Sequence, residues 1–174
     1  MSKTETVYKL TDTNDETRGH TKWGKGVKHT ARGGKEALCT GAWLHAYRDP
    51  YIAMMLNPGH ADFNHPHLWE AEAIVGKDEG DKIGCTEITT VRRIRKPRVS
   101  DKMRRKFAVL VALEVYELWQ EHDKNGVWKS WADDIIAGKK TTDAARAAGA
   151  RDAHKAKKDI DIIAIAHKAC GVSE

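Results

Sequence analysis

The sequence predicts an α+β protein, in which an antiparallel sheet of about five strands in the N-terminal half packs against C-terminal helices. Before Pro97, several short segments alternate apolar and polar side chains, which is typical of half-buried strands. After Pro97, apolar side chains recur every three or four residues, which is the spacing of an α-helix. We therefore expect a mainly β part, 1–98, and a helical part, 100–171. With 174 residues, both parts are expected to form a single domain.

The expected strands are short and are separated by polar turns. Residues 38–47 are apolar on both faces and predict a central strand, whereas 68–75 has one apolar face. The polar run GKDEGDK between 76 and 82 is typical of a hairpin connection. Ile88 and Val91 fall outside a strict two-residue period, which predicts a β-bulge near Thr90. The full set of expected strands is 6–11, 21–31, 38–47, 68–75 and 85–94.

Capping residues mark the expected helices. Asp49 is suited to cap a short helix over 50–57, with Pro50 at its first position and a stop at Pro58 and Gly59. Ser100 similarly precedes a long amphipathic helix over 103–119. Three further helices are expected over 128–137, 141–157 and 159–170, the last ending at Gly171.

One resemblance covers residues 38–120. The run GAWLHAYRDPYIAMMLNPGHA, then LWEAEA, DKIGCTEITTVRRI and RKFAVLVALEVYELW, resembles a family of small, uncharacterised proteins encoded by bacteriophages and prophages. The closing IDIIAIAHKA is more loosely similar. The resemblance implies a phage accessory protein in the cytoplasm of a host cell and assigns no catalytic residue.

Composition excludes several classes of protein. No apolar run is long enough to cross a membrane, and the N-terminus lacks the apolar region of a secretory signal. The three cysteines are far apart and form neither a disulfide framework nor a CxxC pair. We therefore expect a cytoplasmic protein that does not contact membranes. The sequence leaves its oligomeric state open.

The strongest electrostatic feature is RRIRKPRVSDKMRRK, residues 92–106, in which nine residues are basic and Asp101 alone is acidic. Such a density of charge favours a nucleic acid backbone or an acidic host protein as the partner, although charge runs are also typical of solvated connections. Sequence-specific recognition is not expected, because no known DNA-binding or RNA-binding motif is present. The expected function is therefore non-catalytic binding, through Arg92, Arg93, Arg95, Lys96, Arg98, Arg104, Arg105 and Lys106.

An enzymatic alternative rests on polar side chains of neighbouring strands. A strand His, a Tyr and a later Glu resemble the set that positions the nicotinamide dinucleotide in ADP-ribosyltransferases, although the spacing here differs. The same residues are also compatible with simple sheet packing. The weak catalytic candidates are His29, His45, Tyr47, Glu70 and Glu72.

Histidines are concentrated between the short helix and the next strand. His60, His65 and His67 lie in one loop, and His45, Cys39 or Asp62 are further donors that zinc accepts. Loop histidines without a known ligand spacing are more often solvated or hydrogen-bonded. We therefore predict no metal and no cofactor.

Overall fold

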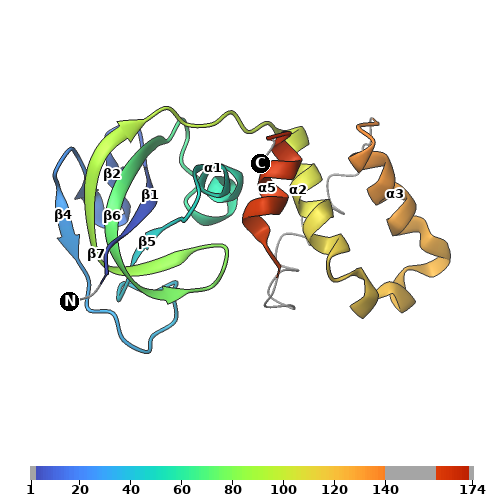
Figure 1. Cartoon of the computed structure of the whole chain (residues 1–174), viewed down its shortest axis with the longest axis horizontal. Coiled ribbons are helices and arrows are strands. Elements are labelled where there is room, and N and C mark those ends of the chain that lie inside the picture. Colours follow the sequence, from blue (N-terminus) through green and yellow to red (C-terminus); the bar gives the residue numbers. More distant parts are fainter. Residues whose placement is uncertain (1–2, 140–159, 173–174) are drawn as a thin grey trace. The chain divides into compact units, whose positions relative to one another are not determined.

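The computed structural model describes residues 3–139 and 160–172. Internal contacts divide the chain into two compact units, Met1–Arg98 and Val99–Glu174. Figure 1 shows the strands in the first unit and most of the helices in the second. The boundary coincides with the predicted change from β to helical structure. That both units belong to a single domain stays a prediction.

The first unit is built on an antiparallel sheet, as predicted. Within the described residues the sheet has five strands, in the order β1-β6-β7-β4, with β5 also paired to β7. A separate two-stranded ribbon follows β1 and encloses the short 3-10 helix η1 (Arg18–His20). The strands are β1 (Glu5–Thr11), β2 (Glu16–Thr17), β3 (Thr21–Lys22), β4 (Lys28–Thr30), β5 (Leu44–Ala46), β6 (His67–Asp78) and β7 (Ile83–Ile94).

The hairpin of β6 and β7 forms the centre of the sheet (Figure 1). The side chains of Trp69, Ala71 and Ala73 are buried, as the alternation predicted. Glu70 pairs with Arg92 and Ala71 with Thr90, so Val91 is the extra residue of a β-bulge. The predicted irregularity near Thr90 is therefore confirmed.

The predicted central strand over 38–47 is wrong for most of its length. Only Leu44–Ala46 is a strand, and the residues from Leu38 to Trp43 lie mainly in turns. Leu38, Ala42 and Trp43 instead form a small buried cluster of their own. The side chains of Leu38 and Trp43 also lie against the backbone of Gly84 in β7. The apolar run therefore packs locally and does not form a strand.

The predicted strand over 21–31 is interrupted by a turn. Gly26 has φ +76°, a left-handed conformation that glycine adopts readily, and its N–H donates to the main-chain oxygen of Thr90 at 2.7 Å. The segment therefore forms β3 of the two-stranded ribbon and, after the turn, β4 of the five-stranded sheet.

Helix α1 (Pro50–His60) begins as predicted and ends later. The Asp49 carboxylate accepts hydrogen bonds from the N–H groups of Tyr51 and Ile52, at 2.7 and 3.1 Å. The helix continues through Pro58, and the Ala61 N–H still donates to the Asn57 carbonyl at 2.9 Å. The buried Asn57 side chain also bonds both main-chain groups of Phe63. These hydrogen bonds to the following loop stabilise the helix about one turn beyond the predicted end.

The second unit contains α2 (Asp101–Leu113), α3 (Val127–Ile136) and α5 (Ile162–Cys170). Ser100 caps α2 as predicted, and its hydroxyl accepts a hydrogen bond from the Met103 N–H at 3.3 Å. Asp161 caps α5, which ends at the left-handed Gly171. The predicted helix 141–157 lies outside the described residues.

The helix expected over 103–119 ends at Leu113. Three 3-10 turns follow: η2 (Tyr116–Leu118), η3 (Gln120–His122) and η4 (Lys124–Gly126). The Asp123 carboxylate orders these turns, because it accepts bonds from the Tyr116 hydroxyl and from the N–H groups of Trp128 and Lys129. The apolar residues beyond Leu113 keep helical spacing in the sequence, although the chain has already turned toward α3.

Helix α2 packs against α5 and α3 within the second unit. Its buried side chains are Phe107, Ala108, Val109, Leu110, Val111 and Ala112. The predicted packing of the C-terminal helices on the sheet stays a prediction. None of the helices in the described ranges combines the length and the apolar character that a membrane span requires.

Candidate functional site

The eight basic residues singled out in the sequence divide between the two units. Arg92, Arg93, Arg95, Lys96 and Arg98 belong to the first unit, and all five are exposed. The other three, Arg104, Arg105 and Lys106, lie in the first turns of α2 and are half-buried. The charge cluster is therefore two groups of side chains carried by different units.

Arg92 is engaged by a carboxylate of the neighbouring strand. Its Nε and Nη2 donate to the two carboxylate oxygens of Glu70 at 2.9 and 2.8 Å, a bidentate pair across β6 and β7. The hydrogen bond from Arg92 also lowers the pKa of Glu70. Glu70, a weak catalytic candidate, is thus the counter-ion of a predicted binding residue.

Arg93 belongs to a polar cluster with Asp15, His67 and Trp69. One carboxylate oxygen of Asp15 accepts from His67 Nδ1 at 2.8 Å and from Trp69 Nε1 at 3.0 Å, and the other lies 3.3 Å from Arg93. Arg93 also lies 3.2 Å from His67 Nε2. Because arginine only donates, Nε2 must be the acceptor, and the His67 proton therefore sits on Nδ1 and faces Asp15.

The surroundings of Asp15 favour the ionised form of its carboxyl. Partial burial raises the pKa of its carboxyl, but the hydrogen bonds from His67 and Trp69 and the charge of Arg93 outweigh burial and lower it. The main chain at Asp15 has φ +59°, an uncommon value outside glycine, which aims the carboxylate at these donors. The cluster ties the loop after β1 to the ends of β6 and β7.

Arg95, Lys96 and Arg98 lie in the segment after β7. The Nζ of Lys96 donates to the main-chain oxygen of Pro66 at 3.1 Å, a bond that leaves the charge of Lys96 uncompensated. Neither Arg95 nor Arg98 has an ion pair with any residue in the ranges 3–139 and 160–172. These two guanidinium groups are exposed, and their charge is available to a partner.

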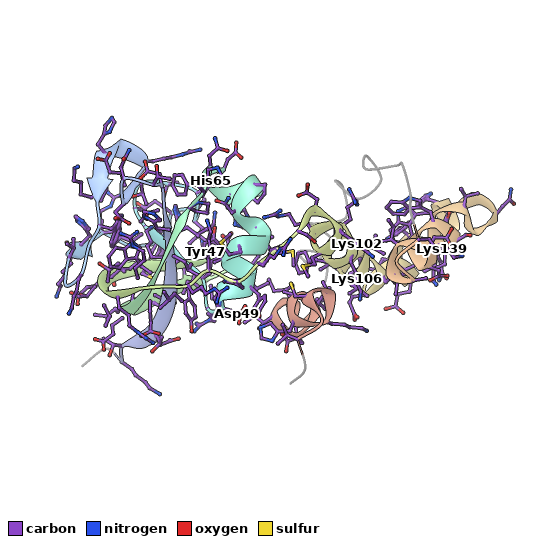
Figure 2. All side chains as sticks on the ribbon, turned by 90° about the horizontal axis from the view of Figure 1, so that it is seen from above. Tyr47, Asp49, His65, Lys102, Lys106 and Lys139 are labelled. Atoms are coloured by element: carbon purple, nitrogen blue, oxygen red, sulfur yellow. The ribbon has the colours of Figure 1, made fainter. Side chains whose placement is uncertain are left out.

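One of the basic residues at the start of α2, Arg104, has a carboxylate partner in the same helix. Cations are disfavoured in the first turn by the helix dipole, yet Arg104 lies 3.0 Å from Asp101, one turn earlier on the helix. Lys102 and Lys106 lie one turn apart along α2 (Figure 2). An acidic partner is therefore not needed to account for Arg104.

The five weak catalytic candidates do not converge. His45 and Tyr47 line one cavity of the first unit, whereas His29, Glu70 and Glu72 are not among its lining residues. His29 Nε2 donates to the main-chain oxygen of Lys22, at 2.8 Å, and its ring packs edge-on to that of Trp23. The described structure thus brings together two of the five.

This cavity has a volume of about 480 Å³. Lys9, Trp23, Trp43, His45, Tyr47 and His60 are among its lining residues. The Tyr47 hydroxyl lies 3.4 Å from His60 Nδ1, and His60 Nε2 lies 3.5 Å from the buried Asp81 carboxylate. Burial raises the pKa of Tyr47 and lowers that of His45.

Lys9 is the residue of this cavity that sequence reasoning missed. Its side chain is only 6% exposed, and its Nζ donates to the main-chain oxygen of His45 at 2.7 Å and lies 4.9 Å from the Trp23 ring centre. Burial lowers its pKa to about 8. The available signal was its position in β1, two residues after Val7 and therefore on the same buried face.

The histidines of the predicted loop have different surroundings in the structure. His60 lines the cavity and His67 is bonded to Asp15, while Figure 2 shows His65 beside the C-terminal end of α1. Within the described ranges, no group of three or more His, Cys, Asp or Glu side chains is arranged to hold a metal ion.

No protein-family model, curated protein or solved structure matches this chain.

Proposed function

We propose that this protein binds nucleic acids by their phosphate backbone, independently of base sequence, through the exposed basic segment from Arg95 to Arg98. The observation that supports the proposal is that Arg95 and Arg98 are exposed and have no ion pair among the described residues. Each guanidinium can then neutralise a phosphate without first breaking an internal pair. Lys96 adds a third charge, with its Nζ held by a neutral carbonyl group.

Arg92 and Arg93 contribute less to this surface than the sequence indicates. Their charges already face Glu70 and Asp15, and a phosphate would have to compete with those carboxylates. Arg105 and Lys106 belong to α2 and form a separate basic group of the second unit. A resemblance to phage-encoded proteins and a host-cell cytoplasmic location are part of the same proposal.

The ADP-ribosyltransferase-like alternative has less support. It requires a glutamate beside the His and Tyr side chains, and Glu70 is instead bonded to Arg92 on the sheet. Glu72 is exposed and is not among the residues that line the cavity with His45 and Tyr47.

The test is binding of a fluorescent 20-nucleotide DNA, single-stranded and duplex, across a series of NaCl concentrations. Backbone binding predicts that the logarithm of the association constant falls linearly with the logarithm of salt concentration. In the double variant Arg95→Glu/Arg98→Glu the slope should become shallower by about two, because about one counterion is released per neutralised phosphate. Both variant positions avoid the internal ion pairs, so the fold is expected to be retained.

The matched control is Lys25→Glu/Lys35→Glu. It makes the same change of net charge at exposed loop positions of the same unit. Its salt slope should stay within the error of the wild type. The proposal is overturned if wild-type protein does not bind DNA at low salt, or if both double variants weaken binding equally. Binding of poly-L-glutamate without binding of DNA would overturn it in favour of an acidic protein partner.

A further inference from the structure

The cavity beside Lys9 has the size of a small-molecule site. Its volume of about 480 Å³ lies in the range of about 300 to 1,000 Å³ that such sites occupy. Its walls come from β1, the β2–β3 ribbon, residues 39–47, the end of α1 with the loop after it, and the turn between β6 and β7, all within the first unit. Five segments of the chain thus line one space.

The charged residues that line this cavity are all basic. Lys9, Arg18 and Lys82 are among its lining residues, and no Asp or Glu is. Asp81 lies behind His60 and does not line the cavity. The charged side chains that line the cavity therefore favour an anion.

Lys9 is the charge that an anion would stabilise most. Its ammonium is buried, its hydrogen bond goes to a neutral carbonyl oxygen, and no carboxylate among the described residues forms an ion pair with it. A buried cation without a counter-ion is costly, because it loses hydration and gains little in return. A bound anion would supply the missing counter-ion.

The remaining walls favour a flat, apolar group. Trp23 donates its indole N–H to Thr17 Oγ1 at 3.0 Å, and Trp43 donates to the main-chain oxygen of Glu36 at 3.2 Å. Both rings are therefore fixed in orientation before any ligand enters. Phe63 adds a third aromatic ring to the lining. Rigid aromatic walls favour a planar ring, which packs against them with little loss of conformational freedom.

We propose that this cavity is a binding site for a small planar organic anion, with the anionic group beside Lys9 and the ring against the tryptophans. The site is independent of the basic segment from Arg95 to Arg98. Tyr47 and His60 are further hydrogen-bonding groups for the ligand, because both line the cavity.

Isothermal titration calorimetry with two matched pairs of probes tests the charge requirement. The first pair is 2-naphthoate and its neutral amide, and the second is adenosine monophosphate and adenosine. At least one anion should bind with a stoichiometry of one and at least tenfold more tightly than its neutral counterpart. Equal binding of anion and neutral partner, or no binding of either anion, would overturn the proposal.

Variants locate the site. Lys9→Met keeps an unbranched side chain one atom shorter and removes its charge, so it should weaken binding of the anion at least tenfold. Lys82→Gln, at a half-buried lining position, should weaken it severalfold, and it provides a second test if Lys9→Met does not fold. Lys25→Met, at an exposed position that does not line the cavity, should leave affinity unchanged. Unchanged affinity in both lining variants would overturn the assignment.

The pH dependence separates Lys9 from its neighbours. With a pKa of about 8, the ammonium loses its proton between pH 7 and 9, and the affinity should fall about tenfold over that interval. The other titratable groups facing Lys9 or lining the same space are Arg18, Cys39, His45, Tyr47, His60, Lys82 and Cys85. Lys9→Met retains all of these, so its affinity should vary much less across the interval. An equal fall in the two proteins would exclude Lys9 as the anion partner.

The proposed DNA-binding function can fail without affecting this result. Arg95→Glu/Arg98→Glu should bind the small anions as the wild type does. Loss of anion binding in that variant, with Lys9→Met unaffected, would place the anion on the basic segment and overturn the cavity proposal.

Discussion

The ammonium of Lys9 lies 2.7 Å from the main-chain oxygen of His45, and this neutral group is its hydrogen-bond acceptor in the buried interior of the first unit. Burial therefore lowers the pKa of Lys9 from 10.5 to about 8. Between these two values the unfolded chain binds more protons than the folded chain. The free energy of unfolding consequently rises with pH in this window and is reduced below it.

We predict that this contribution raises the free energy of unfolding by about 1 kcal/mol between pH 7 and 9. Lys9→Met should lack the rise and should be at least as stable as wild type at pH 7, because it no longer buries an uncompensated charge. Urea unfolding at both pH values gives the comparison. The Cys85 thiol, whose pKa burial raises to about 12, has the opposite effect above pH 9 and is common to both proteins. Parallel pH profiles would contradict the assignment to Lys9.

A second prediction concerns Gly84, where β7 passes under the side chains of Leu38 and Trp43. A Cβ atom at this position would overlap the Leu38 side chain and press on the Trp43 ring. Gly84→Ala should therefore lower the free energy of unfolding by about 1 to 3 kcal/mol. Gly41→Ala is the matched control, since a Cβ there meets no atom within 4 Å. Equal stability of the two variants in chemical denaturation would show that the cluster repacks freely.

The same cluster explains why part of the fold could not be predicted. Alternation was reliable for β6, in which Trp69, Ala71 and Ala73 are buried along a strand that pairs with β1 and β7. It failed for Leu38 and Trp43, because their apolar character serves packing around glycine rather than pairing in a sheet. A local apolar pattern does not distinguish a residue that pairs in a sheet from one that packs against a glycine.

The sequence predicted candidate site residues only where they are close together in the chain. The exposure of Arg95 and Arg98 follows from a dense basic run and is present in the structure. The partner of Arg93 is not predictable in this way, because Asp15 lies 78 residues away in the sequence. The cavity depends on five separate segments, so the sequence indicated His45 and Tyr47 without Lys9 and His60 beside them.

A third prediction tests the cluster around Asp15. Asp15→Asn keeps a residue that tolerates positive φ but loses the charge that His67, Trp69 and Arg93 share. We expect a loss of about 1 to 3 kcal/mol at pH 7, because these donors are left poorly satisfied. Glu72→Gln, on the exposed face of β6, should change stability by less than about 0.5 kcal/mol.

Acid should remove the difference in the free energy of unfolding between wild type and Asp15→Asn. The pKa of Asp15 is below its ordinary value of 3.8, so its stabilising effect is present above pH 3.8 and is lost as pH falls through the folded-state pKa. Urea unfolding of wild type and Asp15→Asn at pH 7 and at decreasing pH below 3.8 gives the two curves. A constant difference at every pH would mean that the variant disturbs the backbone rather than the charge.

The last prediction concerns the second unit and rests on Phe107 in α2. Its side chain is 2% exposed, and α2 packs on α5 and α3. Phe107→Ala should lower the free energy of unfolding of the helices by about 3 to 5 kcal/mol, because it removes buried apolar surface and leaves a cavity. Leu118→Ala provides the control, since Leu118 is 62% exposed and its truncation should cost less than about 0.5 kcal/mol. Helical circular dichroism followed during urea unfolding measures both, and equal midpoints would show that α2 is not a core element of its unit.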